Sequence, residues 1–486
     1  MDDKMKEFIV NDYISLKLQK NNTFIYIGDE KFHKCKYLLL NIPVDKITSF
    51  DEIQSIDEAA ELLDKSMEGH RNKTIQISPE EEFWGHCSNL QVWAEHDYNT
   101  QILHSSLAFS ILKKLVDRGD PKAKRVFKDE IAKRFNSGYT PVMLYLIKNG
   151  YLDHLTDQEF EVLIDKYEEV PEKITLILRS NRRLCLLTLE HLSKGDWVSY
   201  IKKVAESVDL EQRASFLYNV GWYLANVTLE TDKFKTQNYV KKAKDSKISL
   251  AIEVMELALD LPKPPLKLFE ILTYLYGSQN RWDKSINVYE QGIKQIGKLP
   301  MLITGVIMAA FYTGRQDIID KYIDISLKEK EVLNHPFSLS NVLYALNRKE
   351  TKEHSEIALK LLKNYWNSLD FSERKLIQPK GGFSQIQFEP LIPSLLINMT
   401  DSYMVADVMD ETCEKIVQYA LEHLEEMHPI IFENLAWYYL KKGDYINCLH
   451  YLKEAKKRGH PLFDAIKTSP HFRELGEKNE FLKLFE

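Results

Sequence analysis

Cysteine is scarce in this chain of 486 residues, and no two cysteines have the spacing of a metal-binding pair. The number of cysteines is odd and there is no C-x-x-C motif, which disfavours both a disulfide framework and a zinc module. Buried free thiols in a reducing compartment fit this usage better. The five residues are Cys35, Cys87, Cys185, Cys413 and Cys448.

Long apolar runs are also missing. The most membrane-like stretch, residues 301–312, is far too short to span a bilayer and predicts a buried helix. The N-terminal sequence MDDKMKEFIVNDY lacks the apolar centre of a secretory signal. We therefore expect a soluble, cytoplasmic protein with no membrane partner.

Positive charge is not in excess either. The formal net charge of -7 argues against a surface dedicated to nucleic acid, although an acidic chain can hold a local basic patch. Hydrophobic residues make up 44% and charged residues 28%, a globular balance. A chain of this length is expected to form two or three domains, or one extended array of repeats.

The short motifs that mark common enzyme sites are absent from the sequence. There is no G-x-S-x-G, H-E-x-x-H or G-x-G-x-x-G, and the Gly381-Gly382 pair lacks the frame of a phosphate loop. We therefore predict a protein that is not an enzyme and uses no cofactor.

One cluster keeps an enzymatic hypothesis open, that of a hydrolase or metal enzyme centred on Glu82, His86 and His96. Glu82 and His86 are four residues apart and can share one face of a helix. His86 and Cys87 are adjacent, so they point about 100° apart and cannot easily bind one ion. We favour a packed helix with a hydrogen-bonded histidine, and assign no metal site.

Strand character is confined to residues 8–42. The segments FIVNDYISLKLQ and TFIYI alternate apolar and polar residues, and turn residues separate them from each other and from KFHKCKYLLLNI. This pattern predicts a three-stranded antiparallel β-meander. Such a sheet needs a covering helix, and residues 50–67 have helical spacing. We assign residues 1–70 to a small β/α module.

The sequence after this module is punctuated as helices. Ser78, Pro79 and Glu81 supply an N-cap, a first-turn proline and a capping box, and Gly119 ends a later helix. Short connections of this kind pack successive helices antiparallel. Residues 71–210 are predicted to be a helical bundle or atypical helical repeats.

The clearest repeat is PIIFENLAWYYLKKGDYINCLHYLKEAKKRGHP at residues 429–461. It predicts two short amphipathic helices around Gly443-Asp444. The unit resembles a tetratricopeptide (TPR) repeat, about 34 residues that bury one face by stacking on neighbours. Weaker copies precede it, so the resemblance implies a mainly α protein with a TPR-like α-solenoid of antiparallel helix pairs over residues 211–486, ending in a capping helix.

A second resemblance covers residues 8–168. KCKYLLLNIP, EFWGHCSNLQVWAEHDYNTQILHSSLAF and GDPKAKRVFKDEIAKRF resemble the N-terminal module of an uncharacterised prokaryotic repeat-protein family of archaeal type. The resemblance implies an intracellular module coupled to repeats. It transfers no catalytic residue.

When the repeats are aligned, the first-helix positions that face the concave groove in TPR proteins hold aromatic residues and asparagines. Aromatic anchors in a groove are a common means of holding a peptide. The alternatives are that the aromatics pack against the next repeat, and that the asparagines are solvated or cap a helix. The candidate groove residues are Asn219, Trp222, Tyr274, Asn434 and Trp437.

TPR co-chaperones that bind acidic tails use lysine and asparagine at set groove positions. The corresponding positions here hold Glu270 and Tyr274. The resemblance therefore implies binding of a peptide or partner protein in general, and not of a chaperone tail. We predict an interaction scaffold or adaptor.

The alternative from another class is a nucleic-acid-binding regulatory or defence-type sensor. It rests on a lysine-rich insertion at residues 227–246 and on a small cluster of Arg179, Arg182 and Arg183. Basic residues interleaved with aromatics can bind single strands, although a solvated loop has the same composition. The lysines are Lys233, Lys235, Lys241, Lys242, Lys244 and Lys247.

Residues 370–393 break the helical period of the C-terminal half. Long irregular segments inside a compact array are more often functional than accidental. The sequence leaves the role of this segment open.

Overall fold

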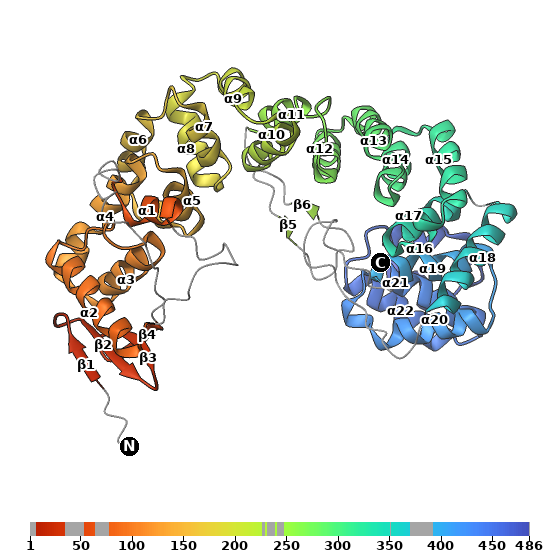
Figure 1. Cartoon of the computed structure of the whole chain (residues 1–486). Coiled ribbons are helices and arrows are strands. Elements are labelled where there is room, and N and C mark those ends of the chain that lie inside the picture. The colour runs from red at the N-terminus through yellow and green to blue at the C-terminus, as the bar shows by residue number, and fades with distance from the viewer. Residues whose placement is uncertain are drawn as a thin grey trace. The chain divides into compact units, whose positions relative to one another are not determined.

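The computed structural model describes residues 6–34, 53–63, 77–225, 229–230, 239–240, 247–349, 351–369 and 392–485. Over these residues the protein is mainly α-helical and carries a small antiparallel sheet near its N-terminus, as the sequence predicts (Figure 1). The chain divides into two compact units, Met1–Ser207 and Val208–Glu486. None of the described helices is long and apolar enough to cross a bilayer.

The N-terminal sheet has four strands, so the prediction of three was wrong. They are β1 (Lys6–Ile9), β2 (Ile14–Gln19), β3 (Asn22–Ile27) and β4 (Glu30–Lys34), each antiparallel to the next. A turn splits the first predicted strand because Asn11 Oδ1 accepts hydrogen bonds from the backbone N–H groups of Tyr13 and Ile14, both at 2.9 Å. The last predicted strand extends to residues outside the described part of the chain.

Two helices pack on this sheet. Helix α2 (Pro79–Glu95) contacts β2 and β3, and helix α3 (Ser105–Arg118) contacts β3. Helix α1 (Ile56–Leu63) lies inside the range predicted for the covering helix. Its polar contacts go to α3 and to α4 (Pro121–Asn136), so it fastens helices together.

The helix ends of the first unit follow the predicted punctuation. Ser78 Oγ accepts a hydrogen bond from the Glu81 N–H at 3.2 Å, and Glu81 Oε2 accepts one from the Ser78 N–H at 2.8 Å. Gly119 ends α3 with a φ of 91°. The remaining helices are α5 (Thr140–Lys148), η2 (Tyr151–His154), α6 (Asp157–Asp165), α7 (Pro171–Leu178), α8 (Arg182–Leu192) and α9 (Trp197–Glu206).

The second unit is a succession of helices joined mostly by short turns (Figure 1). The early helices are α10 (Leu210–Ala225), α11 (Ile248–Glu256), α12 (Leu266–Ser278), α13 (Trp282–Ile296), α14 (Pro300–Thr313), α15 (Gln316–Lys328), α16 (Lys330–Asn334) and α17 (Pro336–Asn347). The later ones are α18 (Lys352–Ser368), α19 (Pro393–Ala406), α20 (Glu411–Glu422), η5 (Leu424–Glu426), α21 (Ile431–Lys441) and α22 (Tyr445–Lys457). Two short strands, β5 (Leu229–Glu230) and β6 (Tyr239–Val240), pair within the lysine-rich insertion.

The helices of the second unit pack in two ways. Neighbours along the chain contact each other, as in α12 with α13, α14 with α15 and α21 with α22. Alternate helices also contact each other, so that α14 packs on both α12 and α17, and α19 on both α17 and α21. Each of these helices therefore buries apolar residues against more than one neighbour.

The C-terminal end of the second unit is built from short turns of helix in place of the predicted capping helix. Its elements are η6 (Phe463–Thr468), η7 (Pro470–Leu475), α23 (Asn479–Leu482) and η8 (Lys483–Phe485). Buried Phe472, Leu475 and Phe481 join the apolar core that α21 and α22 also share. The segment thus covers the end of the helix array although it lacks one long helix.

Candidate functional site

A pocket of about 370 Å³ lies among α12, α13, α14 and α17 in the second unit. We call it the α12–α17 pocket. Its wall combines aromatic rings, two methionines, several small residues and one carboxyl group. The lining residues are Glu270, Thr273, Tyr274, Gly277, Ser278, Trp282, Ser285, Tyr289, Met301, Gly305, Met308, Ala309, Tyr312, Phe337 and Asn341.

Two glycines allow the aromatic rings of α13 to lie close to the neighbouring helices. A Cβ atom at Gly277 of α12 would stand 2.5 Å from the ring of Trp282, and one at Gly305 of α14 would stand 2.5 Å from the ring of Tyr289. Glycine inside a helix costs about 1 kcal/mol relative to alanine. The close ring contacts explain why the smallest residue occupies both positions.

A stacked aromatic pair forms one edge of the pocket. The rings of Trp282 and Tyr312 are nearly parallel, at 9°, with their centroids 4.0 Å apart. Tyr312 is 64% exposed, so the pair reaches the protein surface. The pair presents a flat apolar face, on which an aliphatic or cationic group can pack.

The carboxyl group of Glu270 is the unusual feature of the pocket. The residue is only 8% exposed, and its Oε1 atom is buried without a hydrogen-bond partner among the residues that the structure describes. Burial raises the pKa of Glu270 to about 7, and the positive charge of Lys267 opposes this rise. A buried polar atom without a partner is costly, so Glu270 is poised to accept a hydrogen bond from a ligand.

The other polar groups near Glu270 are engaged within the helices. Thr273 Oγ1 donates to the backbone oxygens of Phe269 and Glu270, at 2.7 and 2.9 Å. Ser285 Oγ donates to the backbone oxygen of Thr273 at 2.9 Å. Burial, with a smaller contribution from the negative charge of Glu270, raises the pKa of Tyr289 to about 12, against the opposing effect of a hydrogen bond with Thr273. Tyr289 therefore stays neutral beside Glu270.

The structure places the predicted groove residues in different surroundings. Tyr274 is half-buried and lines the α12–α17 pocket. Asn219 and Trp222 are half-buried on α10, where the ring of Trp222 lies 6.2 Å from that of Tyr218. Of the five candidates, Tyr274 alone belongs to the pocket lining.

The two candidates on α21 are buried in the core. Asn434 is 2% exposed and Trp437 is 1% exposed. Asn434 Nδ2 donates to the backbone oxygen of Ile397 at 3.2 Å and to Thr400 Oγ1 at 2.8 Å. Both acceptors belong to α19, so Asn434 joins α21 to α19. The packing alternative raised for the aromatic residues describes Trp437. Asn434 has neither the solvated nor the capping role raised for it, and both residues are buried away from a ligand in this structure.

Sequence reasoning missed Trp282, Tyr312, Gly277 and Gly305 as parts of a site. The sequence held a usable signal. Gly305 lies inside the helix predicted at residues 301–312, where no turn requires a glycine. Glycine inside a helix often marks close packing of a side chain from another element. Which rings fill that space depends on tertiary packing, which one sequence does not reveal.

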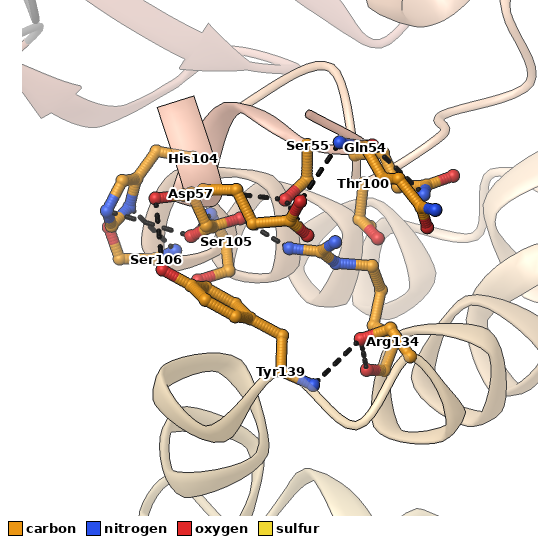
Figure 2. A network of polar contacts seen from close by, with 12 residues as sticks. Gln54, Ser55, Asp57, Thr100, His104, Ser105, Ser106, Arg134 and Tyr139 are labelled. Atoms are coloured by element: carbon orange, nitrogen blue, oxygen red, sulfur yellow. Dashed lines mark hydrogen bonds and ion pairs between the residues drawn. The ribbon is translucent and has the colours of Figure 1, made fainter. Parts of the chain in front are cut away.

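The first unit contains a buried polar network that joins α1, α3 and α4. Figure 2 shows Arg134 of α4 directed at Asp57 of α1, with Ser105 of α3 beside the same carboxylate. The Arg134 Nη2 to Asp57 Oδ2 distance is 2.5 Å, and Asp57 Oδ1 accepts a hydrogen bond from the Ser105 N–H at 3.0 Å. Close by, Glu130 accepts two hydrogen bonds from Thr100, at 2.7 and 2.8 Å. These contacts fasten three helices together.

The residues of the metal hypothesis do not assemble a ligand set. His86 Nε2 lies 3.5 Å from Glu82 Oε1, and burial lowers the pKa of His86. Cys87 is buried on the same helix, and burial raises its pKa to about 12. Within the described ranges, no group of three or more His, Cys, Asp and Glu side chains could hold a metal ion.

The basic residues of the nucleic-acid hypothesis are only partly described. Lys247 precedes α11 and is half-buried, whereas the other five lysines lie outside the described residues, as does most of the irregular segment 370–393. In the arginine cluster, Arg183 donates to Asp157 Oδ1 at 2.7 Å and to the backbone oxygen of Leu155 at 3.0 Å. Arg183 therefore has partners within its own unit.

The fold and these sites define a mainly α-helical protein whose second unit carries an apolar pocket with one buried carboxyl group. A scan of the chain against models of known protein families gives no match, and no curated protein is significantly similar to it.

Proposed function

We propose that this protein is a non-enzymatic, TPR-like scaffold or adaptor that binds a peptide or partner protein, with the α12–α17 pocket as the anchor site for one side chain of that partner. The supporting observation is the pocket of about 370 Å³, walled by aromatic rings and methionines and holding a buried polar group. Ligand pockets of proteins combine these features, and this volume is at the small end of their range.

The position of the pocket among several helices supports a partner that is a polypeptide. The pocket is lined by residues of α12, α13, α14 and α17, and α14 packs on both α12 and α17, so the site lies within the series of packed helices. Helical repeat proteins bind extended partners along such surfaces, with a few anchoring side chains in pockets. Aromatic residues and methionines are common in anchoring pockets because they bury a large apolar area.

Selection from a phage-displayed library of random peptides tests this proposal. The full chain is expected to enrich peptides that share a motif. Ser278 is exposed, lines the pocket and ends α12, so Ser278→Phe adds bulk at the pocket without disturbing the core.

Ser368 provides a matched control, because it is also exposed and ends α18. Both serine hydroxyls donate to the backbone oxygen three residues earlier, at 2.7 Å. We expect Ser278→Phe to abolish binding of the selected peptides and Ser368→Phe to preserve it. The proposal fails if no motif is enriched, or if both variants bind as the unchanged protein does.

A further inference from the structure

We propose that the α12–α17 pocket selects a cationic side chain, a lysine or arginine of the partner polypeptide, and that Glu270 accepts the hydrogen bonds of its charged end. This inference rests on the proposed function, because it names the chemistry of the anchor that the pocket holds. It is argued from the charges and surfaces of the pocket lining.

The charge of the lining is the first step. Among the described residues that line the pocket, the tyrosines and Glu270 can ionise, and Glu270 is the one that does so near neutral pH. Its Oε1 atom is buried and lacks a hydrogen-bond partner in the described part of the chain. The lining thus supplies a carboxyl acceptor and no cation, since Lys267, whose positive charge acts on Glu270, is not among the lining residues. A ligand that brings a cationic donor satisfies both at once.

The walls of the pocket fit the rest of such a side chain. Lysine and arginine carry an aliphatic stem, which packs well on methionine and aromatic surfaces. The rings of Trp282 and Tyr312, which stack on each other, line the pocket together with those of Tyr274 and Tyr289. Aromatic faces attract cations, most strongly where water is excluded.

Other ligand classes fit less well. An anionic side chain would meet the carboxylate of Glu270 in an apolar setting, where repulsion is strong. A neutral apolar side chain would leave Oε1 without a partner and would have to force protonation of the acid. A neutral amide donor can bond to Oε1 but gains no charge interaction, so it is the competitor that the experiment must exclude.

Affinity for a cation should also depend on pH. The titratable groups that interact with Glu270 are Tyr218 on α10, Lys267 on α12 and Tyr289 on α13, while α14 and α17 add no charged side chain to the lining. Because the pKa of Glu270 is raised to about 7, the pocket gains its negative charge as the pH rises through this value. Cation binding should strengthen over the same range.

Peptide mixtures with one fixed central residue provide the test. Random heptapeptides are synthesised with lysine, arginine, norleucine, glutamine or glutamate at the centre, and their retention on the immobilised full chain is measured. Norleucine matches the lysine stem without its charge. We expect the lysine or arginine mixture to be retained about tenfold better than the norleucine and glutamine mixtures, which is typical of a hydrogen bond to a charged group.

Two variants assign that preference to the pocket. Glu270→Gln keeps the shape of the side chain and should remove the preference and its rise between about pH 6 and pH 8. Glu253→Gln removes an exposed carboxylate from α11 and should leave both unchanged.

The possible failures are distinguishable. If norleucine or glutamine is retained as well as lysine, and Ser278→Phe abolishes this retention, the proposed function stands and the cation preference is refuted. If Glu270→Gln retains the full preference, the assignment to Glu270 is refuted. If no mixture is retained, both proposals fall.

Discussion

Removal of Asp57 should destabilise the first unit far more than removal of a typical surface carboxylate. Arg134 is 1% exposed, and its Nε and Nη1 atoms have no hydrogen-bond partner among the described residues. Its bond to Asp57 is therefore its main compensation for lost hydration. The variant Asp57→Ala leaves this guanidinium charge buried and also removes the acceptor of the Ser105 N–H.

The magnitude follows from these contacts. Breaking a buried ion pair by removing one partner costs about 3–5 kcal/mol, and the lost hydrogen bond to Ser105 adds about 1 kcal/mol. The cost falls if α1 detaches and water reaches Arg134. In an Arg134→Met background Asp57→Ala leaves no unpaired guanidinium behind, so it should cost about 1 kcal/mol or less, from the lost hydrogen bond to Ser105. The double-mutant cycle should then give a coupling energy of about 2 kcal/mol or more.

The assay is urea denaturation of the full chain, with hydrogen exchange of peptides from α3 and α4 followed by mass spectrometry to locate the change. Asp129→Ala is the control, since it removes an exposed carboxylate from α4 and should cost less than about 1 kcal/mol. The reasoning is refuted if Asp57→Ala costs the same in both backgrounds, within about 0.5 kcal/mol.

Two further predictions concern Glu270 and the helix glycines. The folded-state pKa of Glu270, about 7, lies above its usual 4.5, so ionisation of Glu270 opposes folding. This cost to the free energy of unfolding is absent below about pH 4.5 and reaches about 3 kcal/mol above pH 7. Urea titrations over this pH range should therefore show Glu270→Gln becoming more stable than the unchanged protein by about that amount. Gly305→Ala should lower the melting temperature, because its Cβ would stand 2.5 Å from the ring of Tyr289 and overpacking costs about 1–3 kcal/mol. Gly85→Ala is the control and should raise the melting temperature, because no neighbouring side chain or other element comes within 4 Å of its Cβ. Equal shifts of the two variants would contradict the packing argument.

Local signals predicted the helix boundaries best. The capping box predicted at Ser78 appears in the structure with both of its hydrogen bonds. Prediction failed where a polar side chain altered the backbone. Asn11 bends the first predicted strand into two, because its side-chain oxygen accepts hydrogen bonds from the N–H groups of Tyr13 and Ile14. Asparagine favours turns and caps, but it also occurs within helices and strands, so its effect depends on context.

The site was harder to predict than the fold. Alignment of repeats identifies which residues occupy equivalent positions, but equivalent positions had different burial: Tyr274 lines a pocket, whereas Trp437 is 1% exposed. Glu270 stood out in the sequence only as a departure from the co-chaperone clamp. Its burial, and the lack of a partner for Oε1 among the described residues, depend on how the surrounding helices pack. Such packing has no signature in a short window of sequence.

Two of the buried acids that the structure describes, Asp57 and Glu270, illustrate a structural role and a functional one. Asp57 is paired with Arg134 and accepts a bond from Ser105, so its charge is used to join helices. Glu270 lacks a partner for Oε1 in the described residues, so its charge weakens the fold. A glutamine or leucine would fill the same space without that electrostatic cost. The buried carboxylate of Glu270 lowers the free energy of unfolding, and a ligand that donates a hydrogen bond to Oε1 would offset this cost. This is the physical basis for placing the binding site at Glu270.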